Sequence, residues 1–162
     1  YRMGRGLIAD NLKNALAANP QMASFFMPPG AERDVLFEST YEHVENQGTC
    51  AGCDADRLVR RQPRPSKEPC IHYGTIASAN QVMRHGMARD RLSKEPGVLC
   101  FEMEAAGLMD QLPCLVVRGI CDYSDSHKNK IWQDFAAGVA AVYTKELLGL
   151  VPAQVGEKGM MV

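Results

Sequence analysis

The stretch VLCFEMEAAGLMDQLPCLVVRGICDYSD, residues 98–125, determines the predicted fold class of this chain. Its two apolar runs, Val98–Met103 and Cys114–Ile120, have the length and composition of buried strands. The segment between them, Glu104–Leu112, has the pattern of a short helix that Pro113 ends. An order of strand, helix and strand predicts a βαβ unit, in which the two strands run parallel.

Three carboxylates stand at the predicted strand ends. Glu102 and Glu104 lie where the first strand gives way to the helix, and Asp122 directly follows the second strand. The carboxyl ends of parallel strands are where open α/β sheets bind ligands. This placement suits a site that binds a sugar diol and protonates a leaving group, so the stretch favours sugar-bond chemistry.

Each of these charged residues also has a simpler interpretation. An ionised Glu104 can accept hydrogen bonds from a ribose diol, but a negative charge in a first helical turn is equally well explained by the helix dipole. Asp122 could act as a general acid, whereas its spacing alone favours a loop aspartate bonded to the local backbone. Arg118 lies inside an apolar run and needs a partner, for which one of the carboxylates is the natural choice.

The rest of the chain adds helices and a strand around this unit. Apolar residues at helical spacing predict a helix over residues 7–18. The other predicted elements are a strand over Cys70–Ala77, a helix over Gln81–Leu92 with Ser78 or Asn80 as its N-cap, and an amphipathic helix over Ile131–Leu148. Residues 19–70 are interpreted as an irregular insertion and residues 153–162 as a tail. The predicted fold class is α/β, with a mixed, largely parallel central sheet flanked by helices.

Composition and charge exclude several classes of protein. The 162 residues include 46% hydrophobic residues and carry a net charge of −1, which gives no field to attract nucleic acid. No apolar run approaches the roughly 18 residues of a membrane span. Because no secretory signal is recognisable, we expect a cytoplasmic protein whose six cysteines are reduced. The basic run Arg60–Lys67 contains prolines and is interpreted as a solvated loop, and His85 and His127 are expected at the surface.

These motifs resemble a known family. FEMEAAG at Phe101–Gly107, the RGICD run ending at Asp122 and the surrounding residues 71–152 resemble the nucleoside phosphorylase and nucleosidase superfamily, which includes purine nucleoside phosphorylases and methylthioadenosine nucleosidases. Residues 41–61 match a fungal branch that is often fused to immune-receptor-like domains. The resemblance implies a three-layer sandwich. It also implies that the first strands of the family's sheet are missing, so that residues 1–152 are the C-terminal part of one such domain.

The resemblance also implies a role for each motif residue. Glu104 would bind the ribose hydroxyls, with Met103 packed beneath the sugar. Glu102 would help to hold the sugar or an attacking water. Asp122 would be the catalytic acid that protonates or hydrogen-bonds N7 of the purine. Cys121 stands where the family usually has a serine, a departure that changes what can orient Asp122.

The base pocket is expected to include Ser78 and Val82, which align with the family's base-binding segment. Val82 stands where some nucleosidases have an aromatic residue that stacks on the base. Stacking would therefore have to come from Phe101 or Tyr123. Base specificity stays open.

The implied reaction is cleavage of the N-glycosidic bond of a purine nucleoside or nucleotide through an oxocarbenium-like transition state. Water as the nucleophile would make the protein a nucleosidase, and phosphate as a co-substrate would make it a phosphorylase. Neither a metal nor an organic cofactor is required, and a homo-oligomer is expected. The alternative is a non-catalytic module of the same fold that senses nucleosides or nucleotides. Whether this fragment is active by itself stays open.

The pair Cys50-x-x-Cys53 supports a separate hypothesis. Zinc needs about four ligands, of which C-x₂-C supplies two, and His43, Cys70 or His72 could complete the set. The sequence favours a disulfide within the pair or simple loop thiols, because the other candidates lack regular spacing.

Overall fold

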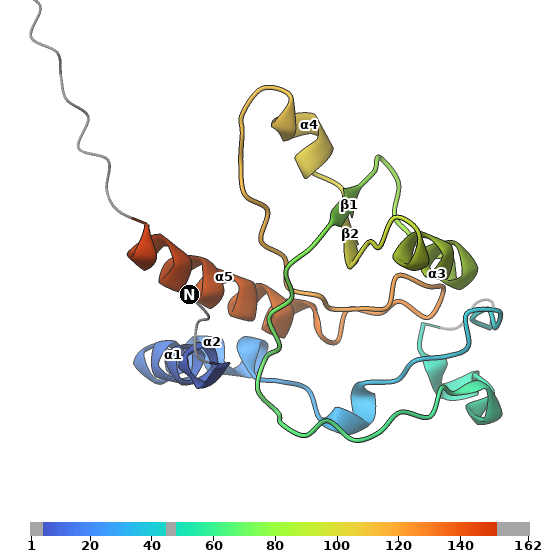
Figure 1. The fold of residues 1–162 in the computed structure, drawn as a ribbon. Helices are drawn as coiled ribbons and strands as arrows, with labels where there is room; N and C mark the ends of the chain where they lie inside the picture. Colours follow the sequence, from blue (N-terminus) through green and yellow to red (C-terminus); the bar gives the residue numbers. More distant parts are fainter. Residues whose placement is uncertain (1–4, 45–47, 152–162) are drawn as a thin grey trace, which may run out of the picture.

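The computed structural model describes residues 5–44 and 48–151 and shows a mixed α/β fold (Figure 1). The α-helices of this part are α1 (Arg5–Ala18), α2 (Pro20–Phe26), α3 (Gly86–Lys94), α4 (Ala105–Met109) and α5 (Gln133–Leu150). The strands are β1 (Ile76–Ser78) and β2 (Cys100–Glu102). Short 3-10 helices lie at Ala31–Arg33, Cys50–Gly52 and Ala55–Arg57.

Helices α1, α2 and α5 pack against one another on one side of the molecule (Figure 1). The Ile8 side chain of α1 is completely buried there. Gly138 of α5 allows a close approach, because a Cβ at this position would lie 3.0 Å from the Phe26 ring. The Asn11 side-chain amide donates to Glu146 at 2.7 Å. The first and last described helices are therefore joined directly.

Strands β1 and β2 form a two-stranded parallel sheet, and α3 lies in the connection between them. Ile76 pairs with Cys100, and Ser78 pairs with Glu102. This is a βαβ unit. Its register sets Ser78, the last residue of β1, beside Glu102, the last residue of β2, at the edge where α4 begins.

The helices predicted over residues 7–18 and Ile131–Leu148 correspond to α1 and α5. The strands predicted over Cys70–Ala77 and Val98–Met103 and the helix predicted over Glu104–Leu112 are present but shorter, as β1, β2 and α4. The helix predicted over Gln81–Leu92 begins later, at Gly86, so the proposed N-caps are wrong. The His85 ring caps α3 instead, since its Nδ1 accepts a hydrogen bond from the Ala88 N–H.

The buried strand predicted over Cys114–Ile120 is wrong. A strand needs a hydrogen-bonding neighbour, and among the described residues β1 and β2 pair only with each other. Leu115 and Ile120 are 75% and 54% exposed. Gly119 lies against α5, where a Cβ would meet the Ala136 carbonyl oxygen at 2.0 Å. The structure thus supports a mixed α/β fold with a small parallel sheet, and a three-layer sandwich is not shown.

Residues 19–70 contain more structure than expected. They include α2 and an isolated antiparallel bridge between Phe37 and Leu58. The basic run Arg60–Lys67 is exposed as predicted, but the Arg61 guanidinium donates to the Asp34 carboxylate at 3.1 Å. The Arg61 guanidinium also donates to the Tyr123 hydroxyl, which joins this segment to the loop after Ile120.

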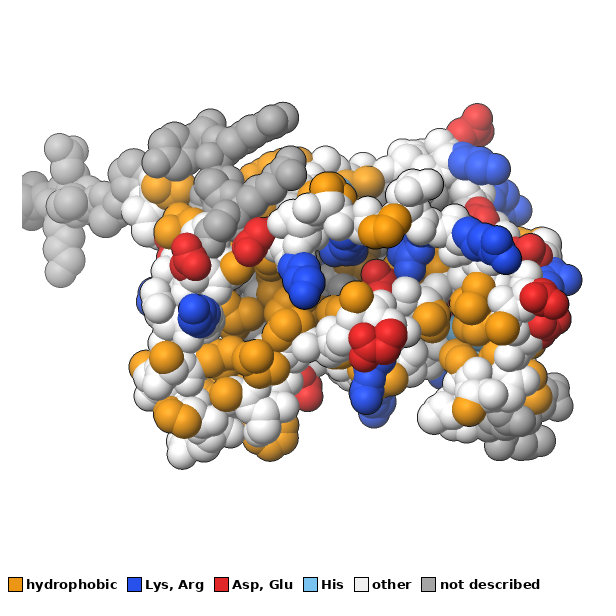
Figure 2. Space-filling model, turned by 90° about the horizontal axis from the view of Figure 1, so that it is seen from below, with side chains coloured by type: hydrophobic (Ala, Val, Ile, Leu, Met, Phe, Trp, Pro, Cys, Tyr) orange, Lys and Arg blue, Asp and Glu red, His pale blue; other side chains and the backbone are white. Residues whose placement is uncertain are grey.

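Hydrophobic side chains reach the surface over much of the face shown in Figure 2. Leu112 and Leu115 are among the most exposed large apolar residues of the described chain. No helix within residues 5–44 and 48–151 is long and apolar enough to cross a membrane. The predicted tail lies outside the described residues.

Candidate functional site

Glu102 is buried at the carboxyl end of β2, with only 5% of its surface exposed. Its Oε2 accepts hydrogen bonds from the backbone N–H groups of Glu104 at 2.9 Å and Ala105 at 2.8 Å. These N–H groups have no partner inside α4, so the Glu102 carboxylate caps the helix. Its Oε1 is buried and has no hydrogen-bond partner among the described residues.

The Glu102 carboxyl is held in its charged form. Burial by itself would raise its pKa, but the nearby Ser78 hydroxyl and the N–H groups of Ala105 and Glu104 outweigh burial. The pKa of Glu102 consequently lies below its ordinary value. A charged carboxylate with one unpartnered oxygen is a strong hydrogen-bond acceptor for a hydroxyl donor.

Glu104 and Met103 lie at the surface next to Glu102. The Glu104 side chain is 65% exposed, and its Oε2 accepts a hydrogen bond from Arg118 at 3.1 Å. Arg118 therefore has a carboxylate partner, as predicted, and this partner is the residue that precedes α4. Met103 is 42% exposed. Both residues to which the resemblance assigns ribose binding are open to a ligand.

A cavity of about 300 Å³ opens beside Glu102. Its polar walls are Ser78 and Glu102, and its apolar walls come mainly from Ala105, Met109 and Leu115. The Ser78 hydroxyl accepts a hydrogen bond from an α4 N–H at 3.0 Å, which ties β1 to this helix. Apolar walls with a few convergent polar groups are typical of sites for small ligands.

Asp122 makes local contacts in the loop that follows the extended segment. Its side chain is 11% exposed and forms an ion pair with Lys128 at 3.1 Å. Its Oδ1 accepts from the Ser124 N–H at 2.9 Å, and its Oδ2 accepts from the Cys121 thiol at 3.4 Å. Cys121, which replaces the usual serine, is thus in contact with the aspartate that it precedes.

The predicted site residues fall into two groups. Ser78, Glu102, Glu104 and the neighbouring Met103 surround the β2–α4 turn. No hydrogen bond or ion pair of the described chain joins Asp122 to either glutamate, and Asp122 does not line the cavity beside Glu102. The residues expected to bind the sugar and the expected acid therefore lie on two separate structural elements.

The residues expected to contact a base do not form one surface. Val82 is 48% exposed and Phe101 is half-buried, and neither lines the cavity beside Glu102. Tyr123 is engaged elsewhere: its hydroxyl donates to Asp34, and the Arg61 guanidinium lies 5.2 Å from the centre of its ring. A base could stack on Tyr123 only from the opposite face or after Arg61 moves.

The sequence analysis missed a buried polar centre next to Asp122. Asp125 is 5% exposed and pairs with Arg89 of α3 at 3.3 Å, and the Arg89 guanidinium also donates to the Tyr123 carbonyl at 2.8 Å. His127 is 7% exposed, so the prediction that it lies at the surface is wrong. The concentration of titratable residues directly after an apolar run was the signal available for this centre.

Three known proteins have sequences similar to this chain. The chain is 48% identical over 126 residues to a nucleotide-binding leucine-rich repeat (NLR)-like protein of Hyaloscypha variabilis, a match that covers 78% of this chain and 12% of that protein. It is 31% identical over 91 residues to a 5'-methylthioadenosine/S-adenosylhomocysteine nucleosidase of Mycobacterium bovis, covering 53% of this chain and 36% of the nucleosidase. It is 35% identical over 84 residues to the ATP nucleosidase Cap17 of Escherichia coli, a match that covers 48% of this chain and 17% of that protein.

The chain is related to nucleosidases. The resemblance to this superfamily, and to a fungal NLR-like protein over most of the chain, is thereby confirmed. The chain spans between 12% and 36% of the length of these relatives. No protein-family profile matches the chain, and no solved structure matches it.

Proposed function

We propose that this chain contributes to a site that cleaves the N-glycosidic bond of a purine nucleoside or nucleotide. The observation that carries the proposal is the β2–α4 turn, where the buried Glu102 carboxylate fixes the helix start and leaves Glu104 and Met103 open to a ligand. Relationship to nucleosidases supports the same reaction class. The substrate, the nucleophile and the mechanism belong to the proposal.

Glu104 would accept hydrogen bonds from the ribose hydroxyls, with Met103 against the sugar. Arg118 holds the Glu104 carboxylate in place before a ligand arrives. As the bond to the base lengthens, positive charge develops on the sugar ring. The carboxylates at this turn would stabilise that charge, and Glu102 would do so while holding the sugar or an attacking water.

Asp122 would donate a proton or a hydrogen bond to the purine. Its carboxylate is paired with Lys128, so Asp122 must first exchange this partner for the base. General acid assistance of this kind contributes roughly 10²–10⁴-fold to the rate. The Lys128 ion pair therefore makes the loop around Asp122 the part of the site that must rearrange.

We further propose that residues 1–152 form part of a single nucleoside phosphorylase-like domain, with residues 19–70 as an insertion and a larger three-layer sandwich around β1 and β2. The outer edges of these strands have no paired strand within residues 5–44 and 48–151, and they would receive the further strands of such a sheet. A homo-oligomer belongs to the same proposal, since a second copy could supply pocket residues that the β2–α4 turn lacks.

A non-catalytic module that senses nucleosides or nucleotides is the second candidate. It is favoured by the separation of Asp122 from the β2–α4 turn and by the similarity to an NLR-like protein. In this case the turn would bind a nucleoside or nucleotide without cleaving it.

Chromatography after incubation with adenosine, inosine, methylthioadenosine and ATP separates the candidates. The longest natural form of the protein is used, with and without phosphate. We expect release of free base, accompanied by the free sugar moiety for a nucleosidase and by its 1-phosphate for a phosphorylase. Binding without base release would contradict both enzymatic versions and support the sensing module.

Recognition of the diol has its own test at the β2–α4 turn. Glu104→Ala should weaken binding and turnover of ribosides far more than of a 2′,3′-dideoxy substrate, because only the riboside offers the hydroxyls. Equal losses with both substrates would contradict the assignment of Glu104.

A further inference from the structure

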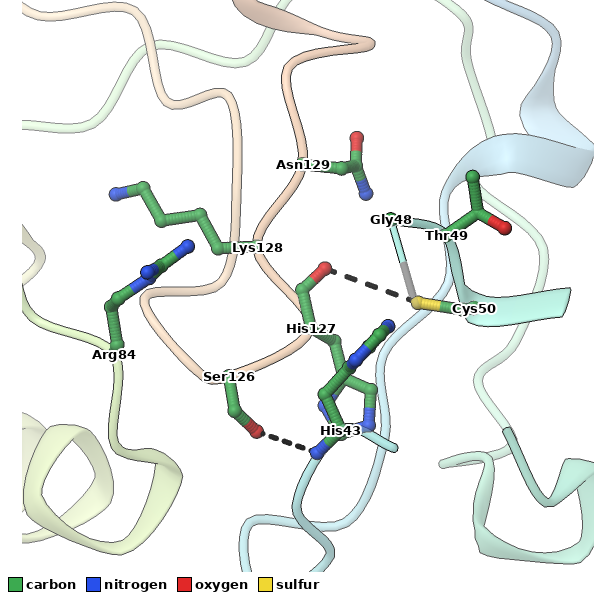
Figure 3. A pocket seen from close by; sticks show the side chains of 9 residues that line it. All are labelled: His43, Gly48, Thr49, Cys50, Arg84, Ser126, His127, Lys128 and Asn129. Atoms are coloured by element: carbon green, nitrogen blue, oxygen red, sulfur yellow. Dashed lines mark hydrogen bonds between the residues drawn. The ribbon is translucent and has the colours of Figure 1, made fainter. Parts of the chain in front are cut away.

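His43 and Cys50 meet the loop after Asp125, which lies far from both in the sequence, around a second cavity of about 320 Å³ (Figure 3). His43 lies near the end of the described segment 5–44, and Cys50 begins a 3-10 helix. Ser126 and His127 come from the loop after Asp125. The His43 N–H donates to the Ser126 hydroxyl at 3.0 Å. The Cys50 sulfur lies 4.0 Å from the His127 carbonyl oxygen.

The donor atoms of His43, Cys50 and Cys53 converge. One ligand atom from each of these residues lies within 4.8 Å of the other two. Both cysteines are half-buried free thiols, so the structure shows the second of the two alternatives that the sequence favoured, simple loop thiols and not a disulfide. In a tetrahedral zinc site the ligand atoms are about 3.3–3.8 Å apart, as zinc–nitrogen and zinc–sulfur distances require. Closure onto an ion would therefore need shifts of only about 1 Å.

The hydrogen bond of the His43 ring leaves one of its nitrogens available to a metal. Its Nδ1 donates to the Val44 carbonyl oxygen at 2.8 Å. A proton on Nδ1 leaves the lone pair of Nε2 free for a metal ion. Zinc-binding histidines commonly donate their other ring N–H to a carbonyl or a carboxylate in this way.

His127 provides an independent observation that points to a ligand. Its side chain is 5% exposed, and both ring nitrogens lack a hydrogen-bond partner among the described residues. Leaving two ring nitrogens buried and unpaired is costly. The ring is stacked on Phe37 with centroids 4.1 Å apart, which holds it in place.

The position of the His127 ring fits a shared ion. Its centroid lies 5.4 Å from that of His43, and two imidazoles on one tetrahedral zinc have centroids about 5 Å apart. The Asp125 carboxylate lies 3.9 Å from His127 Nδ1, on the side where a carboxylate would orient a ligating histidine. Nε2 is then the nitrogen left for the ion.

We propose that His43, Cys50, Cys53 and His127 bind a structural Zn²⁺ ion. The donor atoms of His43, Cys50 and Cys53 already converge, and the His127 ring would have to move closer to complete the set. Two sulfur and two nitrogen donors favour zinc over the harder divalent cations. Cys70 and His72, the other ligands considered for this pair, are exposed and do not belong to the cluster.

A bound Zn²⁺ ion would stabilise the thiolate forms of Cys50 and Cys53 and release their protons.

The ion would connect the segment around residues 43–53 to the loop that carries Asp122. Lys128, the ion-pair partner of Asp122, follows His127 directly and lines the same cavity. Zinc would therefore hold the loop in which the proposed acid lies, without touching a substrate.

Metal analysis of the full natural protein tests the proposal. After purification in a reducing buffer and dialysis without chelator, we expect about one zinc per chain by mass spectrometry of the elements. Cys50→Ser and Cys53→Ser should each lose most of this zinc, while Cys70→Ser, a matched control at an exposed thiol, should retain it. Equal zinc content in all three variants would overturn the site.

His127→Phe tests the fourth ligand, because a phenyl ring can keep the stack on Phe37 while removing both nitrogens. We expect at least a tenfold weaker zinc affinity in a competition titration with a chromophoric chelator. An affinity equal to that of the wild type would overturn the assignment of His127.

Cobalt titration of the wild-type apoprotein gives a result that does not depend on any variant folding. One equivalent of Co²⁺ should produce the intense visible bands of a tetrahedral site and a thiolate-to-metal charge-transfer band, and Zn²⁺ should abolish both. Weak octahedral bands without charge transfer would contradict a site built on Cys50 and Cys53.

Discussion

The β2–α4 turn and the loop around Asp122 differ in how their most buried carboxylates, Glu102 and Asp125, are held. At the turn, Glu102 is bound by N–H groups two and three residues further along the chain. In the loop, Asp125 accepts a local hydrogen bond from the His127 N–H and also pairs with Arg89, thirty-six residues away in sequence. The turn is thus encoded locally, whereas the loop depends on the packing of remote segments. The conformation of the turn therefore depends on nearby residues, whereas the conformation of the loop also depends on its contact with α3.

The largest expected effect tests whether the loop carries chemistry at all. Asp122→Asn should slow base release about 100-fold or more while leaving nucleoside binding nearly unchanged, because an amide cannot donate the proton of a carboxylic acid. Single-turnover rates and equilibrium dialysis on the longest natural form measure the two quantities. Asp110→Asn, at an exposed position after α4, is the control. Unchanged turnover in Asp122→Asn would remove the acid role from the loop.

The second prediction concerns the ion pair between Asp125 of the loop and Arg89 of α3. Asp125→Ala leaves the partly buried Arg89 guanidinium without its buried partner, which should lower the free energy of unfolding by about 3 kcal/mol. Urea unfolding measures this loss. Asp90→Ala removes the more exposed partner of the same arginine and should cost under about 1 kcal/mol. Similar losses in both variants would contradict the contrast between a buried and an exposed partner.

Glu102→Ala tests the local anchoring of the turn. Loss of the helix cap should lower the free energy of unfolding by about 1–2 kcal/mol at neutral pH. Because the folded pKa lies below the ordinary value of 4.5, the stabilisation is fully present above pH 4.5 and disappears as the pH falls through the folded pKa. Urea unfolding at neutral pH and near pH 3 should show the difference between wild type and variant shrink in acid. A difference that is constant with pH would contradict a charged cap.

Arg118→Ala should have the smallest effect on stability. Its ion pair with Glu104 is largely exposed, so the free energy of unfolding should change by about 0.5 kcal/mol or less. Nucleoside affinity should fall measurably in the same variant, since Glu104 would lose the group that orients it. A large loss of stability would show that the turn is not held locally.

The contrast also explains what the sequence could predict. The helices α1 and α5 and the turn from β2 to α4 depend on short-range patterns, and all were predicted in kind. That Cys114–Ile120 forms no strand in the described structure could not be predicted, because an apolar run has the same appearance with and without a neighbouring strand. His127 was placed at the surface because its burial depends on Phe37, which lies in the segment interpreted as irregular.

The contacts of the candidate site also divide into those that the sequence pattern predicts and those that depend on long-range packing. Ser78 and Glu102 meet because two parallel strands end together, a consequence of the βαβ pattern. The contacts of Tyr123 with Arg61 and Asp34 arise from chain segments that carry no periodic signal. Only a description of long-range packing could show that one face of this ring is already covered.

The packing of α1 on α5 has a consequence for synthesis on the ribosome. Asn11 and Glu146 are 135 residues apart in the sequence, so the apolar face of α1 cannot be covered by its final partner until α5 has emerged. At ordinary translation speeds of about 5–20 residues per second, this takes on the order of ten seconds or more. During that interval the side chain of Ile8, which becomes fully buried, is exposed to chaperones and to other nascent chains.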